Sequence, residues 1–269
     1  MASLLPARHL LRNVISHRSM ILALALRDLQ SRYVGTLGGM LWAFAHPLAV
    51  VLVFYLVFAI GFRSQGPVNT PFILWFVGGL VPWFFFSEAL QAITHSVTRN
   101  SHLVKKTVFP TEVLPLVHLV AGLIPHGVFL AVLAGMMLFF HVPLFGERLL
   151  FLYYLLCMGA LLLGLGWLLA ALQVFYRDIG QALTIVLNLW FWSTPIVWSA
   201  DIMPASIAAW LVYNPMNYIV SGYRSTLIFQ TVTWPPLEQS LVFWLATLLL
   251  LVLGSLIFHR LKPEFADVL

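Results

Sequence analysis

The chain has 269 residues, of which 61% are hydrophobic and only 9% are charged. A soluble globular domain carries about 25% charged residues, so this composition excludes that class and predicts an integral membrane protein. The formal net charge of +5 is expected to set topology and to meet anionic lipid rather than nucleic acid.

Residues 1–36 hold five arginines, which interrupt the apolar positions too often for a membrane span. Leu22, Leu26, Leu29 and Tyr33 recur at helical spacing, which predicts an amphipathic helix in the membrane interface. A solvated surface helix is the alternative. We find no internal repeat or linker after it, so residues 37–269 are expected to form one transmembrane domain.

Six apolar stretches follow, at about residues 37–62, 71–93, 112–140, 149–175, 179–197 and 241–258. We therefore expect an all-α integral membrane protein with six transmembrane helices. If the N-terminus is cytoplasmic, the inner segments hold eleven of the 14 lysines and arginines. The outer loops hold the other three, Arg63, Arg148 and Arg224. This bias predicts that both termini are cytoplasmic.

The loop between the second and third spans carries apolar residues near one helical face and cationic residues beside them. The apolar positions are Ile93, Val97, Val104 and Val108, and the cations are Arg99, Lys105 and Lys106. This pattern predicts a short amphipathic helix over residues 94–108 that is suited to dock into a groove of a soluble partner. A lipid-facing loop with snorkelling side chains is the alternative.

Residues 190–217, WFWSTPIVWSADIMPASIAAWLVYNPMN, begin as an apolar helix that is then broken by Pro195, Pro204 and Pro215. Residues 205–213 would reach only about 13 Å as a helix, less than half of a hydrocarbon core of roughly 30 Å. Non-helical backbone at membrane depth needs protein or a watery cavity around it. We expect re-entrant half-helices over residues 200–230 that close a path. An extramembrane loop is the alternative.

Aromatic residues cluster in the first, second and fifth spans. Interfacial anchoring and core packing account for part of this pattern. The second cluster lies well inside its span, however, and aromatic faces stack on the apolar faces of sugar rings. We hypothesise that these side chains line a path for a long glycan: Trp42, Phe44, Trp83, Phe84, Phe85, Phe86, Trp190, Phe191 and Trp192.

Motifs for catalysis or metal binding are absent from the sequence. It contains no G-x-x-x-x-G-K-[ST], no H-E-x-x-H and no G-x-S-x-G. His118 and His126 are two helical turns apart, too far to share one metal without other ligands. We therefore expect neither enzymatic activity nor a metal site in this chain.

Five stretches, taken in order, resemble the membrane subunit of ABC polysaccharide exporters, the type-2 permeases that export O-antigen, capsule or teichoic acid chains. They are RDLQSRYVGTLGGMLWAFAHPL (27–48), GGLVPWFFFSEAL (78–90), NSHLVKKTVFPTEVLPL (100–116), VFYRDIGQ (174–181) and FWSTPIVWSADIMP…YNPMNY (191–218). The resemblance implies a homodimeric channel in a bacterial inner membrane, with two separate ATP-binding cassette subunits that hold ATP and Mg²⁺. It also implies a lipid-linked, O-antigen-like polysaccharide, carried on undecaprenyl diphosphate, as substrate.

The resemblance further implies roles for individual residues. Residues 1–36 would include the interface helix, and Arg99, His102, Lys105 and Lys106 would couple the chain to the ATPase. A gate at the outer side would include Pro195, Pro204, Tyr213, Pro215 and Arg224. Our own hypothesis is that Arg27 and Arg32, with Lys105 and Lys106, meet the lipid diphosphate.

Two other functions are compatible with the sequence. One is a drug or lipid exporter of the same architecture. The other is an ion-coupled secondary transporter that uses Glu88 or Arg224 as a charge relay, since an ionisable residue inside a span is a functional candidate.

Overall fold

The computed structural model describes residues 16–33, 41–63, 66–67, 70–105, 109–229 and 232–269, and within these ranges the regular structure is entirely helical. For residues 32, 33, 43, 44, 46 and 47 only the backbone is described. The shorter elements are α2 (Arg18–Tyr33), α3 (Trp42–Phe54), η2 (Tyr55–Gly61), α5 (Ser96–Arg99), α6 (Ser101–Val104), η3 (Thr111–Val113), η4 (Gly146–Leu150), α9 (Ile179–Ser193), η5 (Ala200–Ile202), α10 (Ala205–Ala208), η6 (Ala209–Tyr213), α11 (Pro215–Leu227), η7 (Lys262–Glu264) and α13 (Phe265–Val268). The long helices are α4 (Phe72–Thr94), α7 (Leu114–Phe139), α8 (Phe151–Phe175) and α12 (Leu237–Leu261).

Four of the helical segments are long and apolar enough to cross a membrane: Phe72–Thr94, Thr111–Phe139, Gly146–Phe175 and Leu237–Val268. Shorter apolar helices cover Leu48–Gly61 and Ile179–Ser193. The helical architecture and these segments confirm the predicted class of multi-pass membrane protein.

The fifth predicted stretch ended at residue 197, whereas helix α9 ends at Ser193. The next residue, Thr194, has extended backbone angles of −100° and 133°. A residue that precedes proline is pushed out of the helical region by the proline ring, and Thr194 precedes Pro195. The break therefore falls four residues earlier than expected.

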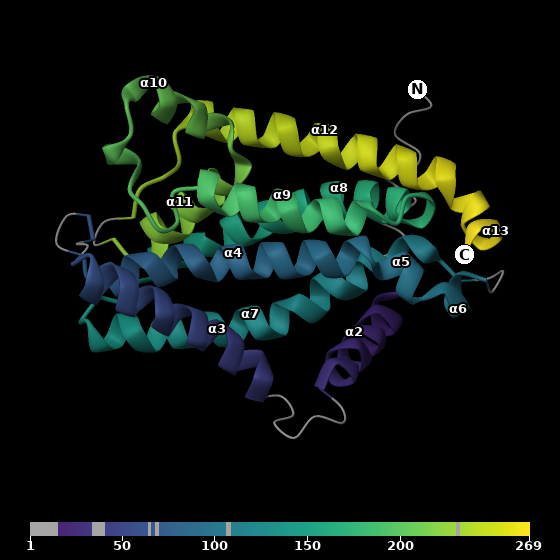
Figure 1. Cartoon of the computed structure of the whole chain (residues 1–269), viewed down its shortest axis with the longest axis horizontal. Coiled ribbons are helices and arrows are strands. Elements are labelled where there is room, and N and C mark those ends of the chain that lie inside the picture. Colours follow the sequence, from purple (N-terminus) through teal and green to yellow (C-terminus); the bar gives the residue numbers. More distant parts are fainter. Residues whose placement is uncertain (1–15, 34–40, 64–65, 68–69, 106–108, 230–231) are drawn as a thin grey trace.

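Helix α4 forms the centre of the bundle, and most of its apolar length is buried inside the protein. It lies against α7, α8, α9 and α11, with α12 on the far side of α8 (Figure 1). Helices α10 and α11 lie at one end of the long axis, and α5, α6 and α13 lie at the other (Figure 1). The tilted helix α2 packs against α7 near the α5–α6 end (Figure 1).

The α5–α6 end has a small core of its own. Val97 and Val104 pack there with residues of α8 and α12 and with Phe265 of α13. Lys262, just after α12, forms an ion pair with Glu112, just before α7. The backbone carbonyl of Glu112 also accepts a hydrogen bond from the indole nitrogen of Trp167 on α8, at 3.2 Å. The ends of α7, α8 and α12 are thus joined beneath α5 and α6.

Helices α8 and α12 approach each other closely where two glycines meet. A Cβ atom on Gly254 would lie 2.2 Å from the carbonyl oxygen of Gly164, and a Cβ on Gly164 would lie 2.8 Å from the amide nitrogen of Leu251. Small residues at such crossings let helix backbones approach within a membrane, where packing supplies much of the attraction.

We predict that Gly254→Ala forces α8 and α12 apart and destabilises the protein by about 1–3 kcal/mol, as overpacking does elsewhere. The measurement is the thermal unfolding midpoint of the detergent-solubilised protein. The matched control is Gly135→Ala on α7, where an added Cβ has open space. An unchanged midpoint for Gly254→Ala would mean that the crossing adjusts freely.

Candidate functional site

An aromatic seam joins α4 to α9. Trp83 lies 6.5 Å from Trp190 and 5.5 Å from Phe191 between ring centroids, and Phe86 lies 5.2 Å from Trp190. Phe54 at the end of α3 reaches Phe191 at 6.3 Å. The structure therefore brings together the aromatic clusters of α4 and α9, which are far apart in the sequence, and adds Phe54 of α3 to them.

The predicted path-lining aromatics differ in their exposure. Trp83, Phe85 and Phe86 are buried within the chain, whereas Phe84, Trp190 and Phe191 are half-buried. Trp42 and Trp192 are exposed, and the side chain of Phe44 lies outside the described part. In this conformation, the buried members of the set pack between helices and the exposed members lie at the surface.

An open aromatic basin lies between the end of α9 and the α10–η6 segment. Its volume is about 560 Å³. Trp210 and Tyr213, 6.0 Å apart, are both largely exposed there. The basin also brings the predicted gate residues Tyr213 and Pro215 next to Trp190 and Trp192. Such a surface can stack on flat apolar groups.

Arg224 of α11 is buried and donates to three backbone carbonyls from two other segments. Its Nε donates to the oxygen of Trp75 at 3.0 Å, Nη1 to that of Pro195 at 2.6 Å and Nη2 to that of Ile196 at 2.7 Å. The guanidinium also lies 3.7 Å from the centre of the Trp75 ring. The predicted gate residues Arg224 and Pro195 are therefore in direct contact, and together they hold α11 against α4 and the α9 break. Pro204 begins the separate α10 turn.

Arg148 in η4 binds the C-terminal end of α11, close to Arg224, a role that the sequence did not indicate. Its Nη1 donates to the carbonyls of Thr226 and Leu227, and its Nη2 donates to that of Phe229. Cations stabilise helix C-termini because the last carbonyls have no partner within the helix. The interacting residues are about 80 positions apart, so no local pattern could have revealed this contact.

Asn214 is a further residue that sequence analysis missed. Its side-chain oxygen accepts from the backbone amides of Met216 and Asn217 and from the indole nitrogen of Trp190, the last at 2.8 Å. Its amide group donates to Thr194 Oγ1 at 3.0 Å. An asparagine directly before a proline is a recognised helix-start signal. The sequence therefore contained the signal for the start of α11, but it did not reveal the hydrogen bonds of Asn214 to Trp190 and Thr194.

The loop between α4 and α7 forms two single-turn helices, α5 and α6, rather than the one helix that we predicted. Asn100 separates them, and its side-chain nitrogen donates to the carbonyl of Ser96 at 2.8 Å. Asparagine side chains compete in this way with the backbone bonds of a helix. The predicted amphipathic character is present, since Val97 and Val104 are buried while Arg99, His102 and Lys105 are exposed. Lys106 lies outside the described residues.

A pocket of about 180 Å³ joins α2 to α6 and α7 at the same end. Arg27 and Asp28 of α2 line it together with His102 of α6 and His118 of α7. The Asp28 carboxylate lies 3.3 Å from His118 Nδ1, where α2 packs against α7. The structure therefore places a candidate diphosphate residue, Arg27, beside a candidate coupling residue. The side chain of Arg32 lies outside the described part.

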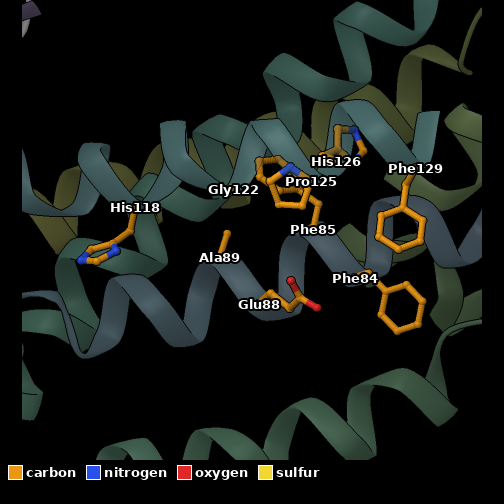
Figure 2. A pocket seen from close by; sticks show the side chains of 9 residues that line it. All are labelled: Phe84, Phe85, Glu88, Ala89, His118, Gly122, Pro125, His126 and Phe129. Atoms are coloured by element: carbon orange, nitrogen blue, oxygen red, sulfur yellow. The ribbon is translucent and has the colours of Figure 1, made fainter. Parts of the chain in front are cut away.

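A small cavity lies between α4 and α7, with Phe84, Phe85, Glu88 and Ala89 on one side and His118, Gly122, Pro125, His126 and Phe129 on the other (Figure 2). Its volume of about 20 Å³ suits roughly one water molecule. His126 stacks on Phe85 and its Nε2 lies 3.1 Å from the hydroxyl of Tyr223 on α11. Among the described residues, no three His, Cys, Asp or Glu side chains are placed to hold a metal ion.

Comparison with known proteins identifies a matching family and similar relatives. Residues 20–228 match the ABC-2 type transporter family. The chain is 30% identical over 266 residues to a Myxococcus xanthus protein named O-antigen export system permease protein RfbA, covering 96% of this chain and 98% of that protein. It is 28% identical over 255 residues to a Klebsiella pneumoniae protein of the same name, covering 93% and 95%.

We predict that Arg224→Lys destabilises the protein, because an ammonium cannot reach three carbonyls as a planar guanidinium does. Each buried carbonyl left without a donor costs about 1–3 kcal/mol. The thermal unfolding midpoint should fall, and limited proteolysis should cut residues 198–213 faster. Arg260→Lys, at an exposed position near the end of α12, is the control. Equal behaviour of the two variants would remove Arg224 from its anchoring role.

Proposed function

The chain belongs to the ABC-2 type transporter family, and we propose that it is the channel-forming subunit of an ATP-driven exporter of a lipid-linked, O-antigen-like polysaccharide. Family membership confirms the predicted class of membrane permease and assigns ATP binding to partner subunits. The observation that carries the substrate proposal is similarity over nearly the full length to relatives named O-antigen export permeases. Membership also favours ATP-driven export over the ion-coupled alternative.

Six spans are part of this proposal. The continuous helix from α3 through η2 has 20 residues, Trp42–Gly61, and would reach roughly 30 Å, enough to cross the hydrocarbon core. Helix α9 has 15 residues and would reach only about 22 Å. The buried segment of residues 194–197 extends it toward the outer surface. These two helices bring the four long segments to six, with both termini in the cytoplasm and the α10–α11 end outside.

The exposed side of α5 and α6 is the proposed docking surface for the ATP-binding subunits. Arg99, His102 and Lys105 point away from a core that joins the ends of α7, α8 and α12. A push on this surface therefore acts on several spans at once. The nearby pocket beside Arg27 and His102 is the proposed place for the carrier diphosphate, since cationic side chains bind phosphate oxygens.

At the opposite end, the segment between α9 and α11 is the proposed gate. It consists of short turns bounded by Pro195, Pro204 and Pro215, and Arg224 and Asn214 fasten its two ends. The aromatic basin beside it offers stacking surfaces to a sugar chain. A homodimer would place two such gates around one path.

The test of this function is uptake into inverted membrane vesicles that hold the chain with its ATP-binding partner. We expect that undecaprenyl-diphosphate-linked polymannose enters the vesicles only when both proteins and ATP are present. The purified chain alone should hydrolyse no ATP. Uptake driven by an ion gradient without the ATP-binding protein would contradict the proposal.

The coupling surface is tested in the same vesicles with the double variant Arg99→Glu and His102→Glu. Because both side chains are exposed, we expect a folded protein whose uptake falls by about tenfold through lost charge complementarity. Arg63→Glu, on an exposed residue at the other end of the molecule, is the control and should keep wild-type uptake. Normal uptake by the double variant would place the docking surface elsewhere.

A further inference from the structure

Helix α9 exposes a row of side chains that is unusual for a membrane-spanning helix. The row covers roughly 80° of the helix circumference, and its members, all exposed, are Gln181, Thr184, Asn188 and Trp192. We call these four residues the polar row. The buried side of the same helix carries Leu183 and Leu187. Asn188 lies about 13 Å along the axis from the first residue of α9, near the middle of a hydrocarbon core of roughly 30 Å.

Helix α12 shows the pattern of a lipid-facing helix in the same protein. Its exposed residues between positions 241 and 256 are all leucine, valine or alanine. The hydroxyl side chains in that range, Thr247 and Ser255, are buried. Polar side chains at membrane depth face protein or a water-filled cavity rather than lipid. The exposed amide of Asn188 therefore indicates that this side of α9 does not face lipid.

The rest of the exposed surface of α9 is apolar. Ala182, Val186 and Leu189 lie beside the polar row on one flank and are exposed. This flank suits lipid chains or another apolar helix. The long side chains of Gln181 and Trp192 in the row itself would keep a neighbouring helix backbone at a distance, whereas close helix crossings use small residues.

The other flank and the outer end of the polar row are aromatic. Phe191 borders the row and contacts Phe54 of α3 and Trp83 of α4. Trp192, the last member of the row, lines the aromatic basin. Helix α9 runs along the long axis of the molecule toward the α10 end (Figure 1). The row is therefore a polar strip, edged by aromatic rings, that leads directly into the basin.

The chemistry of this strip matches a sugar chain. The side-chain amides of Gln181 and Asn188 each offer two donors and one acceptor oxygen, and sugar hydroxyls both donate and accept. Thr184 Oγ1 donates to the carbonyl of Gly180 at 3.1 Å, which leaves the oxygen as an acceptor. The neighbouring rings can stack on the apolar faces of sugars. A hydrocarbon chain would leave the amides without hydrogen-bond partners.

We propose that the polar row is a hydrogen-bonding track for sugar hydroxyls, with Asn188 as its specificity-determining residue. The proposal rests on the function proposed above and narrows its substrate to hydroxyl-rich chains, in contrast to the apolar substrates of a drug or lipid exporter. Successive sugars exchange hydrogen bonds with Asn188 while the chain moves toward the basin. Each exchange costs little, because one hydrogen bond replaces another of similar strength.

The experiment compares two matched polymers in the inverted vesicles that contain the complete complex. One is undecaprenyl-diphosphate-linked polymannose, and the other is the same preparation with part of its hydroxyls converted to methyl ethers. We expect the wild-type complex to take up the unmodified polymer about tenfold faster, because methylation removes the donors that the amide oxygen of Asn188 accepts from. Asn188→Leu should slow uptake of the unmodified polymer about tenfold and bring the two rates to within about twofold of each other.

Two matched variants separate this role from packing. Asn188→Gln keeps the amide and should keep the preference for the unmodified polymer. Leu189→Ile, on the exposed apolar flank, should behave as the wild type with both polymers. Equal wild-type uptake of the two polymers, or an unchanged preference in Asn188→Leu, overturns the track alone. Uptake of neither polymer by an assembled, ATP-hydrolysing wild-type complex overturns the proposed function and this inference with it.

A labelling experiment tests whether the row faces a watery path. The one cysteine of the chain, Cys157, is buried and is first replaced by alanine. During ATP hydrolysis with polymer present, a membrane-impermeant cationic methanethiosulfonate should modify Asn188→Cys and leave Leu189→Cys unmodified. A disulfide between the Asn188→Cys residues of two copies, without labelling, would place the row in the subunit interface and overturn the proposal. Labelling of neither variant would place the row in lipid and overturn it as well.

Discussion

The burial of the Arg224 guanidinium is the interaction on which the α10–α11 end of the structure depends. A helix that stops within a membrane leaves carbonyl groups without donors, and lipid offers none. The break at Thr194 and Pro195 creates this problem at the end of α9. Arg224 solves it by donating to the carbonyls of Pro195 and Ile196. A buried cation and carbonyls without donors are each unfavourable alone. Here the guanidinium supplies the donors and the carbonyls supply the acceptors.

Hydrogen bonds to buried polar groups also explain the position of α11. Arg224 in its last turn holds it to α4, Asn214 ties its first turn to Trp190 and Thr194, and Arg148 binds its last carbonyls. Gly79 leaves room for this arrangement, since a Cβ there would lie 2.4 Å from Arg224 Nη2. A short helix that cannot span the bilayer is thus placed by polar bonds at both of its ends.

Part of this architecture was predictable from local chemistry. Hydropathy identifies the long helices, prolines mark the broken stretch, and alternating apolar and cationic residues indicate the two faces of α5 and α6. The contacts of Arg224 with α4 and the α9 break, and those of Arg148 with the end of α11, could not be predicted, because donors and acceptors lie from 28 to 149 residues apart. Aromatic clustering led to the hypothesis that these side chains line a path, but the burial of Trp83, Phe85 and Phe86 depends on which helices meet. Asn100 shows a third limit, since one side-chain bond divided a helix that the apolar pattern favoured.

The joined ends of α7, α8 and α12 have a mechanical consequence. Lys262, Glu112 and Trp167 tie three spans together directly beneath α5 and α6, and the glycine crossing keeps α8 and α12 from sliding apart. A force applied at this end therefore acts on three joined helices together instead of bending one helix. A displacement of these three helices would reach α9 through its contacts with α4 and α8. The far end of α9 is bonded to Asn214 and leads directly to the carbonyls that Arg224 holds.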